Sequence, residues 1–258
     1  MKFTFGAKNP LDLEWTPGDM VKLRGGCNGA RALLWEVGMK KLWMFALTFA
    51  VAVVSFSGFG ADAEKENPSR VLIAYFSRVG ITDFAEDVDV VSSASLNVGE
   101  DGKLTGNCAV AANMVREATG GDMFQIVTTA KYPSEYDDTT DQAAREQDAN
   151  ARPELAALVK NMDDYDTIFL VYPNWWGTLP MPLFTFLSQY DFSGKTILPL
   201  CTHEGSGLGG SVDDIESLCP NATLLEGLAI RGGDVNGAQN AVKDWIDGLG
   251  MSAASEQP

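Results

Sequence analysis

Five short apolar segments alternate with segments of helical spacing from residue 71 onward. The apolar segments are residues 71–76, 123–128, 167–172, 196–201 and 223–230. Nearly continuous apolar runs of this length are typical of strands buried on both faces of a sheet. The helical segments between them are residues 109–119, 137–161 with an interruption at Pro153, 182–190, 212–218 and 238–249. Strands and helices in alternation predict an α/β fold with a doubly wound, five-stranded parallel sheet.

Two features of this pattern direct the search for a site. Residues 88–106 follow the first strand and include a Gly-Glu-Asp-Gly segment, which predicts a hairpin or another ordered excursion. Ligands of doubly wound sheets bind at the carboxyl ends of the strands, near the point where the strand order reverses. The loops after the first, third and fourth strands are therefore where chemistry is expected.

An apolar stretch precedes the predicted domain. Residues 42–58 are almost entirely apolar, with two lysines before them and an Ala-Asp-Ala sequence after them. This arrangement predicts a secretory signal peptide over residues 39–63 and export of residues 64–258 to a periplasmic or extracellular space. The alternative is an uncleaved anchor, for which the stretch is borderline because a span needs about 20 apolar residues. We interpret residues 1–38 as an upstream extension from a start codon placed too early, or as disordered; a cytoplasmic extension ahead of an anchor is the alternative.

The charge of the chain excludes one class of function. The sequence holds 35 Asp and Glu against 19 Lys and Arg, a net charge of −16, whereas a nucleic-acid-binding protein needs a basic surface for phosphate contacts. An acidic surface steers a basic partner, and it serves solubility equally well. Export permits a disulfide, and Cys201 with Cys219 is the favoured pair because they end an apolar strand and the next helical segment. Two buried free thiols are the alternative.

The loop after the first strand is a candidate phosphate site. Hydroxyl side chains and a glycine let backbone N–H groups and side chains surround a phosphate. The loop is no P-loop, because the Gly-Lys-Ser/Thr ending is absent, and an ordinary strand-to-loop turn is the alternative. Its residues are Ser77, Arg78, Val79, Gly80, Ile81 and Thr82.

Two further loops have the composition of a site for a planar ring. The loop after the third strand places Trp175 and Trp176 side by side among Gly and Pro, which indicates stacking on a ring; the alternative is that both are core residues, and we expect one of them to be. The glycines of residues 202–210 allow close approach of a ligand, but their G-x-G-x-x-G spacing is no dinucleotide motif, because it follows the fourth strand rather than the first. His203 lies in no hydrolase motif or metal-ligand cluster, so neither a catalytic residue nor a metal site is predicted.

Together the three loops resemble those of the flavodoxin family, in the form found in exported flavoproteins with a widened first loop. YFSRVGIT is similar to the family's phosphate loop, with Ser77, Gly80 and Thr82 matching and Val79 in place of a hydroxyl residue. YPNWWGTLP and CTHEGSGLGGS resemble its two flavin-ring loops, and YPSEYDDTTDQAAREQDANARPEL is also similar to this subgroup. The resemblance spans residues 70–249 and implies strand order 2-1-3-4-5 and an FMN cofactor. It implies cofactor contacts from the first loop and from Pro173, Asn174, Trp175, Trp176, Gly177, Thr178, Thr202, His203, Glu204, Gly205, Ser206 and Gly207.

Two departures from the family pattern change the expected site. Residues 83–106 separate the phosphate loop from the helix whose positive N-terminus faces the phosphate in short flavodoxins. The excursion therefore either shields the ribityl side of FMN or weakens phosphate binding, and Arg78 is expected to compensate with its charge. The fourth-strand loop lacks the tyrosine that commonly covers one flavin face, which leaves stacking to Trp175 or Trp176 with His203 as a helper. The backbone near Trp176, Gly177 and Thr178 is the candidate for binding the polar edge of the ring.

The resemblance implies an electron carrier in which FMN supplies the redox chemistry and the protein supplies binding, orientation and electrostatics. One alternative is an FMN-dependent NAD(P)H or quinone-type reductase, which needs room beside the ring for its substrate. The other is a non-redox module that kept the fold and lost the cofactor. The expected partner is a redox protein or a small-molecule acceptor of unassigned identity. Contact with nucleic acid is not expected, and contact with a membrane is expected only if the signal segment stays uncleaved.

Overall fold

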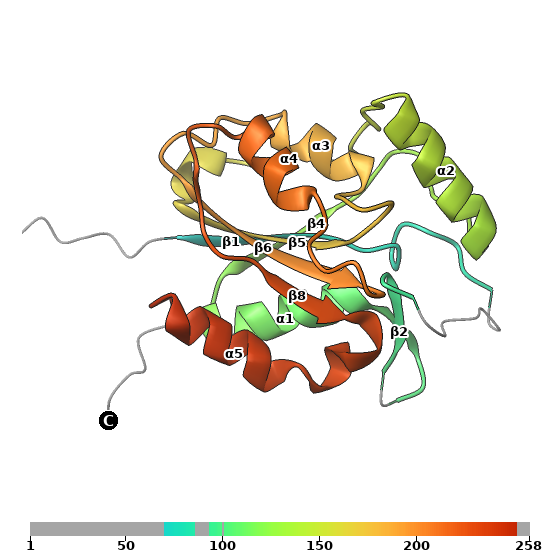
Figure 1. Cartoon of the computed structure of the whole chain (residues 1–258), viewed down its shortest axis with the longest axis horizontal. Helices are drawn as coiled ribbons and strands as arrows, with labels where there is room; N and C mark the ends of the chain where they lie inside the picture. The colour runs from blue at the N-terminus through green and yellow to red at the C-terminus, as the bar shows by residue number, and fades with distance from the viewer. Residues whose placement is uncertain (1–69, 86–92, 100, 252–258) are drawn as a thin grey trace, which may run out of the picture. The chain divides into compact units, whose positions relative to one another are not determined.

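The computed structural model describes residues 70–85, 93–99 and 101–251 (Figure 1). The predicted signal peptide over residues 39–63, residues 1–38 and part of the predicted excursion lie outside the described residues. Among the helices that are described, none is both long and apolar enough to span a membrane.

A parallel sheet forms the centre of the domain. Its strands run in the order β4-β1-β5-β6-β7, with β8 also paired to β6, which confirms the doubly wound α/β fold and the strand order 2-1-3-4-5. β5 is buried at every position, as expected for a continuous apolar run between two helical layers. The bounds are β1 Val71–Phe76, β4 Asp122–Ile126, β5 Thr167–Pro173, β6 Thr196–His203, β7 Thr223–Leu224 and β8 Leu228–Arg231.

The prediction of one continuous fifth strand over residues 223–230 is wrong, because this segment forms two short strands, β7 and β8. β7 pairs with Thr196 and Ile197 of β6, whereas β8 pairs with the later part of β6 from Leu200 onward. The interruption lies opposite Pro199, which has no N–H to donate to a ladder. A Cβ on Gly227 would lie 3.0 Å from the Pro199 carbonyl oxygen, so the chain passes close to β6 there without pairing.

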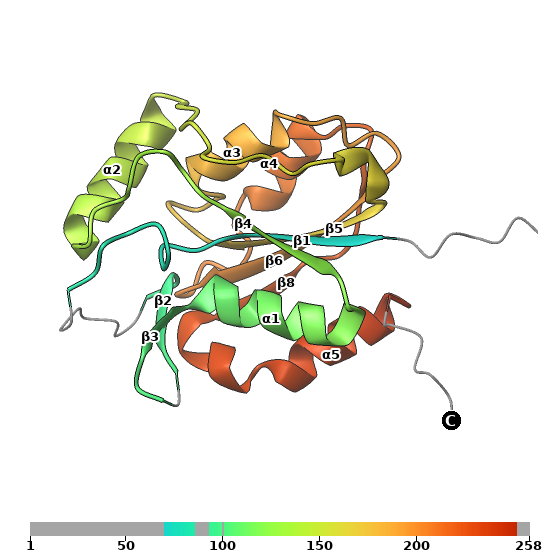
Figure 2. The same cartoon turned by 180° about the vertical axis from the view of Figure 1, so that it is seen from behind.

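Helices cover both faces of the sheet. α1 and α5 pack on one face, and α3 and α4 on the other, with α2 on the α3 and α4 side over the carboxyl ends of the strands (Figures 1 and 2). Buried apolar side chains form one core on each face, represented by Phe186 and Leu170 on the α3 side and by Val115 and Phe169 on the α1 side. The bounds are α1 Asn107–Thr119, α2 Tyr136–Asp148, α3 Met181–Leu187, α4 Ser211–Leu218 and α5 Gln239–Gly248.

The helix predicted over residues 137–161 is too long, because α2 ends at Asp148. Asn150 adopts a left-handed backbone with φ of 47°, a conformation that ends helices. The chain then runs back along the end of β4, where the N–H of Thr129 donates to the Glu154 carbonyl at 2.9 Å. Residues 149–161 therefore form a connection rather than a continuation of the helix.

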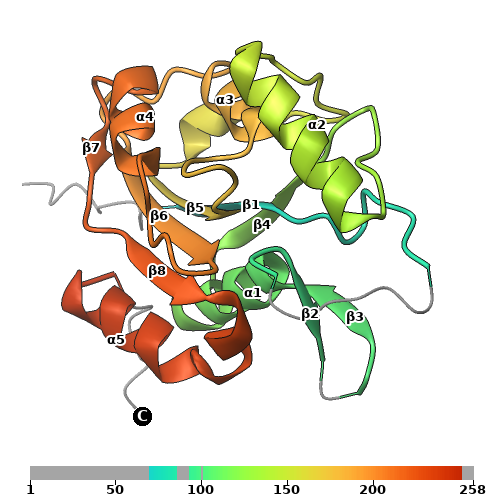
Figure 3. The ribbon, with the colours of Figure 1, turned by 45° about the vertical axis from the view of Figure 1, so that its right-hand side comes forward.

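The excursion after β1 contains the predicted hairpin. β2, Leu96–Val98, pairs antiparallel with β3, Leu104–Gly106, and the hairpin lies beside α1 (Figure 3). The Nδ2 atom of Asn107 donates to the carbonyls of Ser93 and Leu96 at 2.7 and 3.1 Å. The hydroxyl of Thr202 at the end of β6 donates to the Ala94 carbonyl at 2.6 Å. These bonds bring the returning arm of the excursion to the carboxyl ends of the strands.

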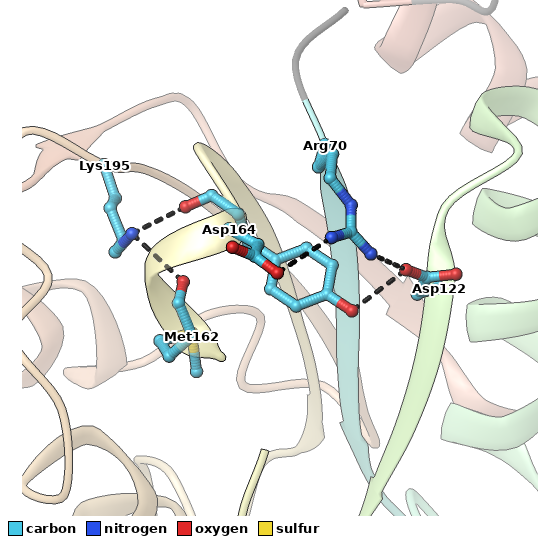
Figure 4. A network of polar contacts seen from close by, with 6 residues as sticks. Arg70, Asp122, Met162, Asp164 and Lys195 are labelled. Atoms are coloured by element: carbon cyan, nitrogen blue, oxygen red, sulfur yellow. Dashed lines mark hydrogen bonds and ion pairs between the residues drawn. The ribbon is translucent and has the colours of Figure 1, made fainter. Parts of the chain in front are cut away.

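A polar network joins the other end of the sheet (Figure 4). Arg70 forms ion pairs with Asp122 at 3.0 Å and with Asp164 at 3.1 Å, and the hydroxyl of Tyr165 donates to Asp122 at 2.9 Å. The buried ammonium of Lys195 donates to the carbonyls of Met162 and Tyr165 at 3.1 and 2.7 Å. The bonds from Tyr165 and Arg70 hold the pKa of Asp122 below its ordinary value. This network links strand beginnings far from the carboxyl-end loops, so its role is structural.

Cys201 and Cys219 are buried free thiols, so the favoured disulfide is wrong and the alternative holds. Both side chains belong to the core on the α3 and α4 face. Burial raises the pKa of Cys219 to about 11 and that of Cys201 further still. Both groups are therefore neutral core side chains at physiological pH, as is Cys108, whose pKa is raised to about 12.

Candidate functional site

The loop after β1 is folded tightly against β4. The N–H of Ile81 donates to the Arg78 carbonyl at 3.1 Å and closes a turn in which Gly80 has a φ of 93°, a conformation that favours glycine. Gln125 of β4 donates from Nε2 to the Val79 carbonyl at 2.8 Å. A Cβ on Gly80 would lie 3.2 Å from that Nε2 atom. The conformation of the loop is therefore fixed by its own turn and by the hydrogen bond from Gln125 of β4.

Buried hydroxyls in this loop have no partner among the described residues. Ser77 Oγ and Thr82 Oγ1 are both buried and unbonded, and so are Arg78 Nε and Asn107 Oδ1 nearby in the fold. Buried polar groups are almost always hydrogen-bonded, because a buried group without a partner costs about 1–3 kcal/mol. Four such atoms in one region indicate a place for a polar ligand.

The N-terminus of α1 lies beside this loop in spite of the excursion. Gly106, which precedes α1, packs so closely on the loop that a Cβ there would lie 2.0 Å from Ser77 Oγ. The first turn of α1 has neither an acidic residue nor a side-chain cap, so its positive end is not neutralised locally. The inserted residues therefore lengthen the connection between β1 and α1, but the N-terminus of α1 still lies beside the loop that the sequence predicted to bind phosphate.

Arg78 is a buried cation without a carboxylate partner. Its Nη2 atom donates to the carbonyls of Pro133 and Ser134 at 2.6 and 2.9 Å, and none of the ion pairs between described residues includes it. Desolvation lowers the pKa of this guanidinium to about 10, with Glu135 opposing the shift. The group stays charged at neutral pH, so its environment favours an anion.

The two tryptophans point to different environments. Trp175 packs edge-on against Phe76 and Tyr132, with ring centroids 5.4 and 5.3 Å away, and its Nε1 atom donates to Ser95 Oγ at 2.9 Å. Trp176 is 59% exposed, has a φ of 51°, and donates from Nε1 to the Thr140 carbonyl at 2.8 Å. Trp175 is therefore partly buried and packs against the core, and Trp176 is the more exposed of the two.

The loop after β6 is bonded to the tryptophan loop. The Nδ2 atom of Asn174 donates to the Gly207 carbonyl at 3.0 Å, and the N–H of Gly210 donates to the Gly177 carbonyl at 2.8 Å. Gly209 must be glycine, because a Cβ there would lie 2.2 Å from the Gly177 carbonyl oxygen. These contacts hold the two loops as one unit.

Three side chains of the β6 loop have their own partners. His203 accepts at Nδ1 from the N–H of Gly205 at 2.8 Å, so its ring closes a local turn. The Thr202 hydroxyl donates to the Ala94 carbonyl in the excursion. Glu204 has a carboxylate oxygen 3.7 Å from Nε of Arg231 at the end of β8. Among the described residues, no three His, Cys, Asp or Glu side chains are grouped so that they could hold a metal ion.

A cleft of about 460 Å³ opens between these loops, the excursion and α2. Seven predicted residues line it: Arg78, Asn174, Trp175, Trp176, Gly177, Glu204 and Ser206. Six lining residues were missed: Ala94, Ser95, Tyr136, Thr139, Thr140 and Ala143. The remaining predicted residues do not line it: Ser77, Val79, Gly80, Ile81, Thr82, Pro173, Thr178, Thr202, His203, Gly205 and Gly207. Those missed on α2 share one helix face, since they are spaced by three, four and seven positions, but their sequence spacing alone says nothing about which sheet edge that face meets.

Comparisons with known proteins agree with this architecture. The chain is similar to the crystal structure of a "putative flavoprotein" from Bacteroides eggerthii, with 24% identity, 71% of this chain and 99% of that chain covered, and a TM-score of 0.54. It is similar to a second "putative flavoprotein", from Bacteroides uniformis, with 25% identity, 69% and 98% covered, and a TM-score of 0.53. None of the curated proteins matches the chain. The family model described as Flavodoxin matches residues 103–249, more than half of the sequence, and the chain therefore belongs to the flavodoxin family.

Proposed function

We propose that the protein binds FMN, with the phosphate at residues 77–82 and the ring in the cleft beside Trp176, and that it transfers electrons through this cofactor. The observation that carries the proposal is the set of buried, unbonded donors in the loop after β1, which are Ser77 Oγ, Arg78 Nε and Thr82 Oγ1. When bound, FMN supplies the redox chemistry. The chain's own residues bind and orient it.

The phosphate end has the donors that a dianion requires. Ser77 and Thr82 provide hydroxyls that have no other described partner, and the free Nε–H of Arg78 provides a charge-assisted donor. The N-terminus of α1 adds its positive dipole beside Ser77, which favours an anion at this position. The residues present therefore fit the phosphate of FMN.

The ring end has the shape and surface for a planar conjugated system. A cleft of about 460 Å³ falls within the usual range for small-molecule sites, about 300–1,000 Å³. An indole exposed at its wall offers a stacking surface. The main-chain N–H groups of Asn174, Trp175 and Gly177 are already bonded within the protein. We therefore expect the ring edge to meet the main chain at Trp176, whose N–H is in none of the hydrogen bonds between described residues.

The surroundings of the cleft favour a protein partner of positive charge. Glu135, Asp137 and Asp138 are exposed at the start of α2, which contributes to the cleft wall. In a chain with a net charge of −16, these carboxylates would accelerate encounter with a basic redox protein at low ionic strength. The alternative is a reductase acting on a small acceptor, which a turnover assay with reduced nicotinamide and a quinone separates from a carrier.

The test uses the purified full chain with FMN and with riboflavin, which has the same ring but no phosphate. After removal of free flavin, retained visible absorption with quenched fluorescence is expected for FMN, together with much weaker retention of riboflavin. Equal retention of both flavins contradicts the phosphate assignment. A protein that retains neither flavin is the non-redox module. Stepwise reduction of the loaded protein, followed by absorbance, then separates one-electron from two-electron behaviour.

We also propose that the protein is exported. The support is the apolar stretch of residues 42–58, with two lysines before it and an Ala-Asp-Ala sequence after it, the pattern of a cleavable signal peptide. Mass spectrometry of the protein recovered from fractionated cells is expected to give a chain that begins at residue 64. A chain that keeps the apolar segment and partitions with membranes supports the anchor instead.

A further inference from the structure

Two of the large exposed hydrophobic side chains of the described residues lie at the same cleft. Four such residues are exposed by more than a third: Val98, Tyr136, Leu158 and Trp176. Tyr136, at 62%, and Trp176, at 59%, both line the cleft, whereas the other two do not. Exposed aromatic rings gathered at one concave surface mark a binding site for an apolar or planar ligand.

Tyr136 has no internal role that would explain its presence. Its side chain is absent from the hydrogen bonds and ring contacts between described residues. It is the first residue of α2, and a tyrosine ring left in water gains nothing for folding. The side chain is therefore available to a ligand in the cleft.

The backbone that carries Tyr136 is held by the loops of the proposed FMN site. Arg78 of the phosphate loop donates to the carbonyls of Pro133 and Ser134, just before the helix. The hydroxyl of Thr139 donates to the carbonyls of Pro133 and Glu135 at 3.0 and 2.8 Å, which closes the start of the helix. Trp176 of the ring loop donates to Thr140, one turn after Tyr136.

We propose that Tyr136 is the second aromatic contact of the flavin ring, supplied by α2 in place of an aromatic residue in the loop after β6. The inference rests on the proposed function. Residues 202–210 contain no tyrosine, tryptophan or phenylalanine, and the one ring there, His203, is bonded into its own turn. Tyr136 is a cofactor-binding residue that stacks on the ring and orients it from α2, the helix to which Trp176 is bonded. A ring covered from α2 favours electron transfer to an external partner over chemistry on a substrate stacked at that face.

The experiment compares Tyr136→Ala and Tyr136→Phe with wild type, and uses Leu158→Ala as a matched control that removes an exposed apolar side chain outside the cleft. FMN is titrated into each full-length apoprotein, and the dissociation constant and the residual fluorescence of bound flavin are measured. Tyr136→Ala is expected to weaken binding about threefold to tenfold, because one aromatic stacking contact is lost, and to raise the residual fluorescence. Tyr136→Phe keeps the ring and is expected to match wild type, as is Leu158→Ala.

The outcomes separate this inference from the function on which it rests. Wild-type protein that binds FMN, together with Tyr136→Ala of unchanged affinity and quenching, overturns the role of Tyr136 and leaves the proposed function standing. Wild-type protein that retains no FMN overturns both. Thermal unfolding of the apoproteins provides the structural check: equal midpoints for Tyr136→Ala and wild type support a ligand-directed side chain, and a large drop for the variant contradicts it.

Discussion

Thr82→Val tests the phosphate loop at a single atom. The substitution replaces the buried hydroxyl of Thr82 by a methyl group and keeps the branched shape of the side chain. Thr82 Oγ1 has no partner among the described residues, whereas the proposed complex gives it a phosphate oxygen. The substitution is therefore expected to act with opposite sign on the free and the FMN-bound protein.

The magnitudes follow from the two environments. A buried polar group without a hydrogen bond costs about 1–3 kcal/mol, so the apoprotein is expected to become more stable by up to that amount. A hydrogen bond to a charged group contributes about 1.5–3 kcal/mol, which corresponds to a loss of FMN affinity of about tenfold to 150-fold. Riboflavin carries no phosphate, so its affinity is expected to stay unchanged.

The assays are urea unfolding of the apoproteins and fluorescence titration with FMN and riboflavin. Thr128→Val is the matched control, because Thr128 is equally buried but its hydroxyl donates to the Ala130 carbonyl at 2.6 Å. The control is expected to lose about 1 kcal/mol of stability and to keep its FMN affinity. The reasoning is refuted if the Thr82→Val apoprotein is destabilised like the control, or if it binds FMN as tightly as wild type.

Three further predictions concern other parts of the domain. Gly106→Ala places a Cβ 2.0 Å from Ser77 Oγ, so it is expected to displace Ser77 and weaken FMN binding in the same titration, and unchanged affinity contradicts the packing argument. Glu204→Gln removes a negative charge from the cleft, and redox titration is expected to give a more positive FMN potential because electrons are added against less repulsion; a potential that stays the same or falls contradicts this. Asp122 has a pKa lowered by Tyr165 and Arg70, so it contributes stability above its unfolded pKa of about 3.9 and loses that contribution as the pH falls through its folded pKa. Asp122→Asn is therefore expected to be less stable than wild type at pH 7 by at most about 1 kcal/mol, because the ion pair is exposed. Urea unfolding at decreasing pH should show this difference disappearing once the pH falls below the folded pKa of Asp122. A difference that stays constant with pH refutes the linkage.

The sheet could be predicted because its signal is local. The first and third predicted strands are nearly continuous apolar runs, and residues 71–76 match β1 without change. The split of β7 from β8 depends on where Pro199 of the neighbouring strand lies, which no local pattern within residues 223–230 contains. The end of α2 could not be predicted locally either. It depends on the pairing of residues 154–156 with the segment that follows β4, which is distant in the sequence.

The sequence predicted which loops border the cleft, but it did not predict which side chains of those loops and of α2 line it. Parallel strands place their carboxyl ends together, so the loops after β1, β5 and β6 had to meet. Which side chains of those loops enter the cleft depends on partners far away in sequence: Thr202, for example, is bonded to the excursion through Ala94 and does not line the cleft. Tyr136 went unnoticed because it lies one residue before the helix predicted over residues 137–161, and the sequence did not show that the start of this helix is bonded to Arg78.

The excursion after β1 reconciles a long insertion with a phosphate site. In a short connection, the helix begins where the phosphate loop ends, and chain continuity alone brings its N-terminus to the ligand. Here continuity is lost, and side-chain bonds replace it: Asn107 at the start of α1 holds the carbonyls of Ser93 and Leu96, while Gly106 packs on Ser77. The same arm carries Ser95 into the cleft, where it accepts a hydrogen bond from Trp175. One inserted segment therefore positions both ends of the proposed cofactor, and changes within residues 93–107 should alter phosphate and ring binding together.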